Sequence, residues 1–257
     1  MLQLTNRVSR SHTSFGCRST FREGILLSHC LTILHAVSRI IAIGDIHGCA
    51  KTFHKLVIDE IRIRKSDTIY CMGDYIDRGP DSKGVIDFIL DLRKKGYQIR
   101  TLRGNHEELM MESGEDDQAY KDWVRNGGDA TLKSFGVSSY ADFPPEYKNF
   151  FNRTRIYLLN GPYIFVHAGL NFGPDDIFKD REAMLWIREF TVDKQKLGDH
   201  KIIHGHTPRP LEAIVNPERD DVYCLDAGCV YKDRPGHGYL VARNLTDGEW
   251  IVVGNCE

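Results

Sequence analysis

Short β-branched runs alternate with longer amphipathic stretches between residues 39 and 102. Runs at 39–43, 67–72 and 97–102 predict strands, and the stretches at about 51–63 and 82–95 predict helices. A strand, a loop, a helix and a further strand form a right-handed crossover unit, which is the building block of parallel sheets. We therefore expect an α/β fold in which these three strands are parallel.

The second half of the chain returns to strands after a different kind of segment. Residues from about 108 to 152 have few strand signals, so we expect a helical insertion there that forms a lid beside a site. Runs at 163–169, 201–208, 222–228, 238–245 and 249–254 again predict strands.

Polar loops follow the predicted strands wherever a parallel sheet would place its functional edge. The first three strands end in GDIHG, GDYIDRGP and RGNHE, and two later strands end in histidine loops. Functional groups gather at the carboxyl edge of such sheets. Five strand ends therefore direct six donor side chains toward one edge: Asp45, His47, Asp74, Asn105, His167 and His206.

The chemistry of these six donors predicts a metal centre. Carboxylate, imidazole and amide groups without a thiolate suit manganese, iron or zinc in a catalytic role. Six donors are too many for one catalytic ion with an open position, but they suit two ions about 3.5–4 Å apart, bridged by a carboxylate and a hydroxide. We expect two divalent ions, with manganese first and iron or zinc as the alternatives.

Each of these motifs has a simpler interpretation when taken alone. A single Gly-Asp at a strand end is usually a turn, an isolated buried histidine is usually only hydrogen-bonded, and HGH could be a zinc pair of an unrelated hydrolase. Their joint occurrence, each at a strand end, favours the metal centre.

The series GDIHG, GDYIDRG, GNHE, HAG and HGHT resembles the calcineurin-like metallophosphoesterase superfamily. The GDxxDRG and RGNHE forms resemble its phosphoprotein phosphatase branch. Residues 123–136 resemble bacterial and phage serine/threonine phosphatases and their diadenosine tetraphosphate hydrolase relatives. The likeness covers residues 39 to about 245, and it implies an αββα sandwich of two mixed sheets flanked by helices, with a helical lid.

The resemblance also implies roles for the motif residues. Asp45 and His47 would hold the first metal ion, and Asp74 would bridge to the second. The second ion would be completed by three further ligands: Asn105, His167 and His206.

Four more residues would take part in catalysis. His106 would be the general acid at the leaving oxygen, oriented by Asp77. Arg78 would bind phosphate oxygens, and Arg188 would be a second phosphate arginine. A hydroxide that bridges the two ions would attack the phosphorus in line, without a phosphoenzyme.

These roles predict a phosphomonoester hydrolase, and first a serine/threonine protein phosphatase, because DYIDRG retains the Asp-Arg pair of that branch. The alternative is a hydrolase of diadenosine tetraphosphate or another small phosphoester. A non-catalytic scaffold of the same fold is a third interpretation. It is less well supported, because every predicted metal ligand and the predicted general acid are present.

Several neighbouring residues have structural interpretations. Glu107 is expected to hold a metal ligand in position without binding the ion itself, and Asp226 could hydrogen-bond a metal-ligating histidine. His204 is expected to be a packed strand-end residue, and Trp123 and Trp186 are expected to be packing residues rather than substrate platforms.

Composition excludes several classes of protein. The 257 residues carry a formal charge of −2 and no basic stripe, so we expect no nucleic-acid partner. No apolar run reaches about 18 residues, so no membrane span is expected. Seven cysteines without a Cys-x-x-Cys pair suit a reducing compartment, and the cytoplasm is expected.

Residues 1–38 differ from the rest of the chain in composition. They are rich in arginine and serine and contain one acid, Glu23. We interpret them as an extension outside the fold, with a targeting peptide or a misassigned start as alternatives. The predicted phosphoesterase domain is therefore 39–257.

Overall fold

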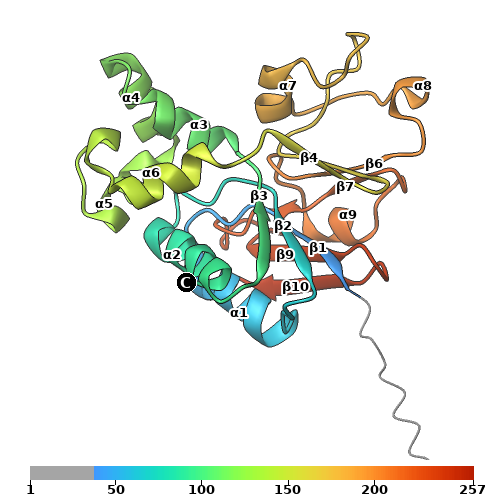
Figure 1. Ribbon diagram of the computed structural model, residues 1–257, viewed down its shortest axis with the longest axis horizontal. Coiled ribbons are helices and arrows are strands. Elements are labelled where there is room, and N and C mark those ends of the chain that lie inside the picture. Colours follow the sequence, from blue (N-terminus) through green and yellow to red (C-terminus); the bar gives the residue numbers. More distant parts are fainter. Residues whose placement is uncertain (1–37) are drawn as a thin grey trace, which may run out of the picture. The chain divides into compact units, whose positions relative to one another are not determined.

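The computed structural model describes residues 38–257, which lie in one compact unit. All but the last residue of the extension predicted at 1–38 lies outside the described residues. The unit consists of two mixed sheets with helices on their outer faces (Figure 1). This is the mixed α/β sandwich that the sequence predicts.

The first sheet has the strand order β10-β9-β1-β2-β3, with β8 paired to β9. Strands β1, β2 and β3 are parallel, whereas β8, β9 and β10 run antiparallel to their neighbours. The bounds are β1 Ile40–Ile43, β2 Thr68–Cys71, β3 Gln98–Thr101, β8 Asp226–Ala227, β9 Tyr239–Asn244 and β10 Trp250–Gly254.

The second sheet has the order β4-β5-β6-β7. Its strands are β4 Tyr157–Asn160, β5 Tyr163–Val166, β6 Lys201–His204 and β7 Val222–Cys224. Strands β5, β6 and β7 are parallel, and β4 pairs with β5 as an antiparallel hairpin. The sequence patterns did not predict β4, which alternates between exposed and half-buried residues at the edge of this sheet.

Alternation along β1 and β2 explains how the layers pack, because successive side chains of a strand point to opposite faces. Ile41, Ile43 and Ile69 pack against the helices on the outer face. Ala42 and Tyr70 point to the second sheet. There the Tyr70 ring stacks on Phe165, with 3.9 Å between the ring centroids.

Two helices cover the first sheet. Helix α1 (Ala50–Lys55) continues as the π-helical turn η1 (Leu56–Glu60), and α2 spans Ser82–Lys94. The Asp81 carboxylate caps α2 by accepting a hydrogen bond of 2.8 Å from the amide of Gly84. Both helices lie within a few residues of the predicted bounds.

Two shorter helices pack on the second sheet, and a third packs on the first. Helices α7 (Arg181–Trp186) and α8 (Lys194–Leu197) contribute Met184 and Leu197 to a cluster on its outer face, while α9 (Leu211–Val215) contacts β8. None of these three helices was predicted from the sequence. Among residues 38–257, no helix combines the length and the hydropathy that crossing a bilayer requires.

The segment predicted as a lid is helical. It contains α3 Asn105–Glu112, α4 Asp117–Trp123, the π-turn η2 Val124–Gly128, α5 Asp129–Phe135, the 3-10 turn η3 Tyr140–Asp142 and α6 Pro145–Asn152. Helix α3 begins inside the RGNHE motif, three residues earlier than predicted. Buried Trp123, Phe150 and Phe151 join the core above the first sheet, so this segment is part of the main packing.

Candidate active site

The loops that carry the predicted site have unusual backbone conformations. Positive φ angles occur at His47 (45°), Asp74 (49°), Asp77 (70°), Arg78 (68°) and His206 (68°). Residues other than glycine adopt this left-handed region rarely, and such strain concentrates at functional sites. The amide of His47 donates to the carbonyl of Asp74 at 2.8 Å, which joins the first two loops.

Glycines in the motifs allow the loops to approach each other closely. A Cβ atom on Gly104 would lie 2.0 Å from Oδ1 of Asp74, and one on Gly205 would lie 2.0 Å from Oδ1 of Asp45. Any larger residue would displace these carboxylates, so the glycines of RGNHE and HGH are required by the site.

Asp74 lies at the centre of the donor cluster. Its Oδ2 is 3.5 Å from Nε2 of His47, and its Oδ1 is 3.5 Å from Nε2 of His167. Two buried groups have donor atoms within 4.8 Å of one another, and both include Asp74: His47, Asp74 and His106, and Asp74, His167 and His206. One carboxylate is therefore shared between two potential metal positions.

Asn105 faces two imidazoles of the second group. Its Oδ1 is 3.0 Å from Nε2 of His167 and 2.8 Å from Nδ1 of His206. Nδ1 of His167 lies 2.9 Å from the carbonyl of Met72 and donates to it, so Nε2 carries a lone pair. Oδ1 of Asn105 and Nε2 of His167 are both acceptors and lie 3.0 Å apart, so one cation could bind both atoms.

His47 is oriented in the same way for the first group. Its Nδ1 donates to the carbonyl of Ile76 at 2.9 Å, which leaves a lone pair on Nε2. Nη1 of half-buried Arg78 donates to this Nε2 at 2.7 Å. The predicted phosphate-binding arginine thus lies directly beside a predicted metal ligand.

Asp45 supplies the clearest sign that the cluster fits metal ions. Its Oδ2 accepts a hydrogen bond of 2.9 Å from the amide of His206, but its buried Oδ1 has no partner among residues 38–257. Burial raises the pKa of Asp45, and the nearby carboxylates of Asp226 and Asp74 raise it further. Buried carboxylates this close together require compensating positive charge, which divalent ions supply.

The protonation states of the ligands agree with metal binding. Burial lowers the pKa of His47 and of His167, and it lowers the pKa of His206 to about 3. These imidazoles are therefore neutral near pH 7, which is the form that binds a metal. Burial alone would raise the pKa of Asp74, but positive charge on the histidines around it lowers this pKa below its ordinary value, and His106 is the one whose own pKa is raised and which can carry that charge.

His106 differs from the other three histidines of the site. Its Nδ1 lies 2.7 Å from Oδ2 of Asp77, and its Nε2 lies 4.0 Å from Oδ2 of Asp74. Burial acts to lower the pKa of His106, but Asp74 and the hydrogen bond to Asp77 outweigh it, so the net shift is upward. A protonated imidazole next to the donor cluster is what a general acid requires.

Two side chains that the site predictions missed hold Asp77 in place. Oγ1 of Thr131 donates to Oδ1 at 2.6 Å, and Nε1 of Trp123 donates to Oδ2 at 3.0 Å. Trp123 is fully buried, as expected for a packing residue, but it also fixes the partner of His106. The available signal was the likeness of residues 123–136 to phosphatases.

Of the two neighbouring carboxylates, Glu107 supports a predicted ligand as expected, whereas Asp226 does not. Glu107 accepts hydrogen bonds from the amides of Asp74 and Tyr75, both at 2.8 Å, so it holds the loop backbone rather than a ligand side chain. Burial raises the pKa of Asp226 to about 7. Asp226 hydrogen-bonds no histidine among the described residues and instead accepts from the amide of Gly228, so that expectation was wrong.

The loop after α7 borders the cluster from the other sheet. Burial is the main cause of the low pKa of His206, and the positive charges of His167 and of exposed Arg188 lower this pKa further. Trp186 is 37 % exposed, contrary to the packing expectation, and its carbonyl lies 3.2 Å from Nε2 of His206. His204 is buried against Phe190, as expected.

The sequence profile of the family described as "Calcineurin-like phosphoesterase" matches residues 38–242. The chain belongs to this family. The two buried donor groups around Asp74, which could hold metal ions, lie within the matched residues.

Relatives of this phosphoesterase act on different substrates. A symmetrical bis(5'-nucleosyl)-tetraphosphatase from Nitrosospira multiformis is 29% identical over 51% of this chain and 43% of its own length. Serine/threonine-protein phosphatase 1 from Salmonella typhimurium is 36% identical over 34% of this chain and 38% of its own. The chain thus spans less than half of either relative. The asymmetrical bis(5'-nucleosyl)-tetraphosphatase PrpE from Oceanobacillus iheyensis is 24% identical over 83% of this chain and 91% of its own.

Solved structures share the fold. A cold-active protein-tyrosine phosphatase of a psychrophilic Shewanella superposes with a TM-score of 0.60 at 15% identity, over 84% of this chain and 80% of the other. The likeness at this identity concerns the architecture of the two sheets and their helices.

Proposed function

We propose that this protein hydrolyses phosphomonoesters with two divalent metal ions, manganese first, and with His106 as the general acid. The observation that carries the proposal is the sharing of Asp74 between two buried donor groups beside the His106–Asp77 pair. Asp45 and His47 would hold one ion, and the other would be held by three further ligands, Asn105, His167 and His206. Asp74 would contribute to both.

Each residue around this metal centre would have its own chemical role. When bound, the two ions supply an activated water and polarise the phosphoryl oxygens. Arg78 would leave His47 Nε2 and bind phosphate oxygens with its planar fork, and Arg188 would approach from the other side. His106 would donate the proton on its Nε2 to the leaving oxygen while Asp77 keeps the ring in position.

Two substrate classes are compatible with this chemistry. A serine/threonine phosphoprotein is the first, and the retained pair of Asp77 and Arg78 supports it, because an alkoxide leaving group needs a positioned acid. A dinucleoside tetraphosphate, which is cleaved at a phosphoanhydride bond rather than at a phosphomonoester, is the alternative. It is supported by the bis(5'-nucleosyl)-tetraphosphatase PrpE, which matches this chain over 91% of its own length.

A substrate panel tests the proposal directly. The full chain would be assayed with a phosphoserine peptide, p-nitrophenyl phosphate and diadenosine tetraphosphate, with manganese and with a chelator. Manganese-dependent hydrolysis that the chelator abolishes is the expected result. Equal turnover with the chelator, or none on any phosphoester with manganese, would contradict it.

A further inference from the structure

Two adjacent glycines lie in the turn between α4 and α5, in the helical segment that follows β3 (Figure 1). The π-turn η2 ends in Gly127 and Gly128, and a φ of 100° at Gly127 interrupts its helical conformation. Short π-helical turns often occur at functional sites. This turn meets the loop of Asp77 and Arg78, because the amide of Arg78 donates to the carbonyl of Gly127 at 3.1 Å.

Gly127 packs directly against Arg78. A Cβ atom on Gly127 would lie 2.8 Å from Cγ of Arg78 and 2.9 Å from its amide nitrogen. The contact involves the backbone as well as the side chain, so rotation of the side chain alone cannot relieve it. The guanidinium of Arg78 lies over the ring of Tyr231, 5.8 Å from its centroid. Any side chain at position 127 would therefore move the stem of Arg78 and its guanidinium with it.

Gly128 packs against the indole of Trp123 instead. A Cβ atom on Gly128 would lie 2.5 Å from Cε2 and 2.7 Å from Nε1 of this indole. The same Nε1 donates to both carboxylate oxygens of Asp77, whose Oδ2 lies 2.7 Å from Nδ1 of His106. Gly128 has a helical φ of −65° and ψ of −22°, which alanine adopts freely. The indole, and not backbone strain, therefore disfavours a larger residue at this position.

We propose that Gly127 and Gly128 are positioning residues, one for each member of the Asp77–Arg78 pair. Gly127 sets where the Arg78 guanidinium binds the substrate phosphate. Gly128 keeps the Trp123 indole on Asp77 and so holds the general acid in line with the leaving oxygen. The inference rests on the phosphoesterase function proposed above. Because a phosphate contact and a proton donor affect different kinetic constants, substitutions at these two neighbours should cause different losses.

Gly127→Ala tests the phosphate contact in the manganese-loaded full chain. We expect kcat/KM to fall about tenfold or more, mainly through KM, and equally for a phosphoserine peptide and p-nitrophenyl phosphate, because both present the same phosphate. Gly136→Ala is the matched control, since Gly136 also has a positive φ, 66°, but a Cβ there would meet nothing within 4 Å among residues 38–257. We expect its kinetics to stay unchanged. Equal losses in the two variants would overturn the role of Gly127.

Gly128→Ala is tested with the same two substrates. We expect kcat for the phosphoserine peptide to fall about tenfold or more, while kcat for p-nitrophenyl phosphate changes little, because only the alkoxide needs a proton. Trp123→Phe removes the indole N–H without adding a contact, and it should reproduce this pattern. Equal losses on the two substrates in both variants would overturn the role of Gly128.

A double-mutant cycle separates positioning from a general loss of packing. If Gly127 acts through Arg78, adding Gly127→Ala to Arg78→Ala should cause no further loss of kcat/KM. Losses that multiply would show an independent effect and overturn the proposal. Gly127→Asn is the second substitution, because asparagine tolerates a positive φ better than alanine and carries the same Cβ, and it should give the same result. Circular dichroism and manganese content confirm that the variants are folded and loaded.

Binding of inorganic phosphate separates this inference from the function on which it rests. In calorimetry with the manganese-loaded protein, we expect Gly127→Ala to bind phosphate about tenfold more weakly and Gly128→Ala to bind it as wild type does. A wild type that hydrolyses neither substrate, but binds phosphate in this Gly127-dependent way, would refute the proposed function and support the positioning of Arg78. A wild type that hydrolyses both substrates, while the two variants lose phosphate affinity alike, would refute the inference and keep the phosphoesterase.

Discussion

Four histidines lie in one buried cluster, and their partners divide them into two kinds. Burial lowers the pKa of His47, His167 and His206, which makes them neutral ligands, while Asp74 and Asp77 outweigh burial at His106. The sequence motifs named all four histidines as site residues, and the structure brings them together; their roles stay predictions. The sequence did not predict that Trp123 holds Asp77, because that hydrogen bond joins residues 46 positions apart and depends on tertiary packing.

At the residue scale, His106→Ala tests the general acid. We expect hydrolysis of a phosphoserine peptide to fall by about 10²–10⁴-fold and hydrolysis of p-nitrophenyl phosphate to fall far less, because an aryl oxide leaves without a proton. Steady-state kcat for both substrates with manganese is the measurement. Equal losses on the two substrates would remove His106 from the acid role.

The sequence predicted the helices and strands that have a local hydrophobic pattern, and it missed the others. Strands β1, β2 and β3 and helix α2 were found because continuous apolar runs and amphipathic spacing are local signals. Strand β4 and helices α7 to α9 were missed because they are short and half-exposed, so packing decides their conformation: β4, α7 and α8 pack with the second sheet and α9 with the first. The glycine contacts that join the loops also depend on the assembled fold.

Gly205→Ala tests one of these contacts. A Cβ here would lie 2.0 Å from Asp45 Oδ1, so we expect weaker binding of one manganese ion while the sheet stays folded. Manganese titration by calorimetry is the measurement. Gly254→Ala in β10 is the control, since its Cβ would approach nothing closer than 3.9 Å. Unchanged manganese affinity in Gly205→Ala would show that Asp45 is not a ligand.

Asp67→Asn tests the bracing of the first two strands. Asp67 precedes β2 and accepts a hydrogen bond of 2.6 Å from Nη2 of Arg39, which precedes β1. Burial acts to raise the pKa of Asp67, but Arg39 and the amide of Arg64 outweigh it, so the folded pKa lies below the ordinary 3.8. We expect the substitution to lower the free energy of unfolding at pH 7 by about 1–3 kcal/mol.

The dependence on pH follows from the sign of that shift. A depressed carboxyl pKa stabilises the fold above the unfolded pKa, and this stability is lost as pH falls through the folded pKa. The difference between wild type and Asp67→Asn in urea unfolding should therefore be largest near neutrality and shrink below pH 4. A difference that stays constant down to pH 2 would contradict the ion-pair account.

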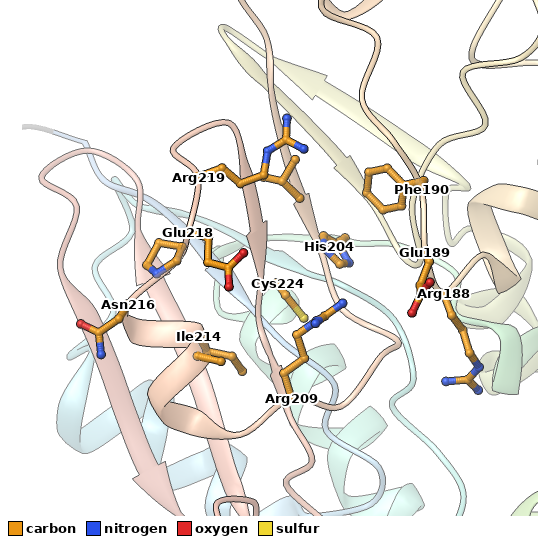
Figure 2. Close-up of a pocket in the computed structure, with 13 residues that line it drawn as sticks. Arg188, Glu189, Phe190, His204, Arg209, Ile214, Asn216, Glu218, Arg219 and Cys224 are labelled. Carbon is orange, nitrogen blue, oxygen red and sulfur yellow. The ribbon is translucent and has the colours of Figure 1, made fainter.

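At the scale of the whole molecule, two sheets meet so that strand ends from both contribute to one site. Asp45, Asp74 and Asn105 come from the first sheet, and His167 and His206 come from the second. The sequence indicated five strand ends but not which sheet each belongs to, because the sheet pairing involves contacts between distant segments. A pocket lined by His204, Arg209 and Ile214 (Figure 2) likewise forms only where β6, β7 and α9 assemble.

The most direct test of this account is the number and position of manganese ions in the purified protein. Crystals grown with manganese should show two anomalous peaks on either side of the Asp74 carboxylate, and Asp74→Asn should lose turnover while its circular dichroism stays unchanged. A single peak near Asp74, or none, in protein saturated with manganese would contradict the account.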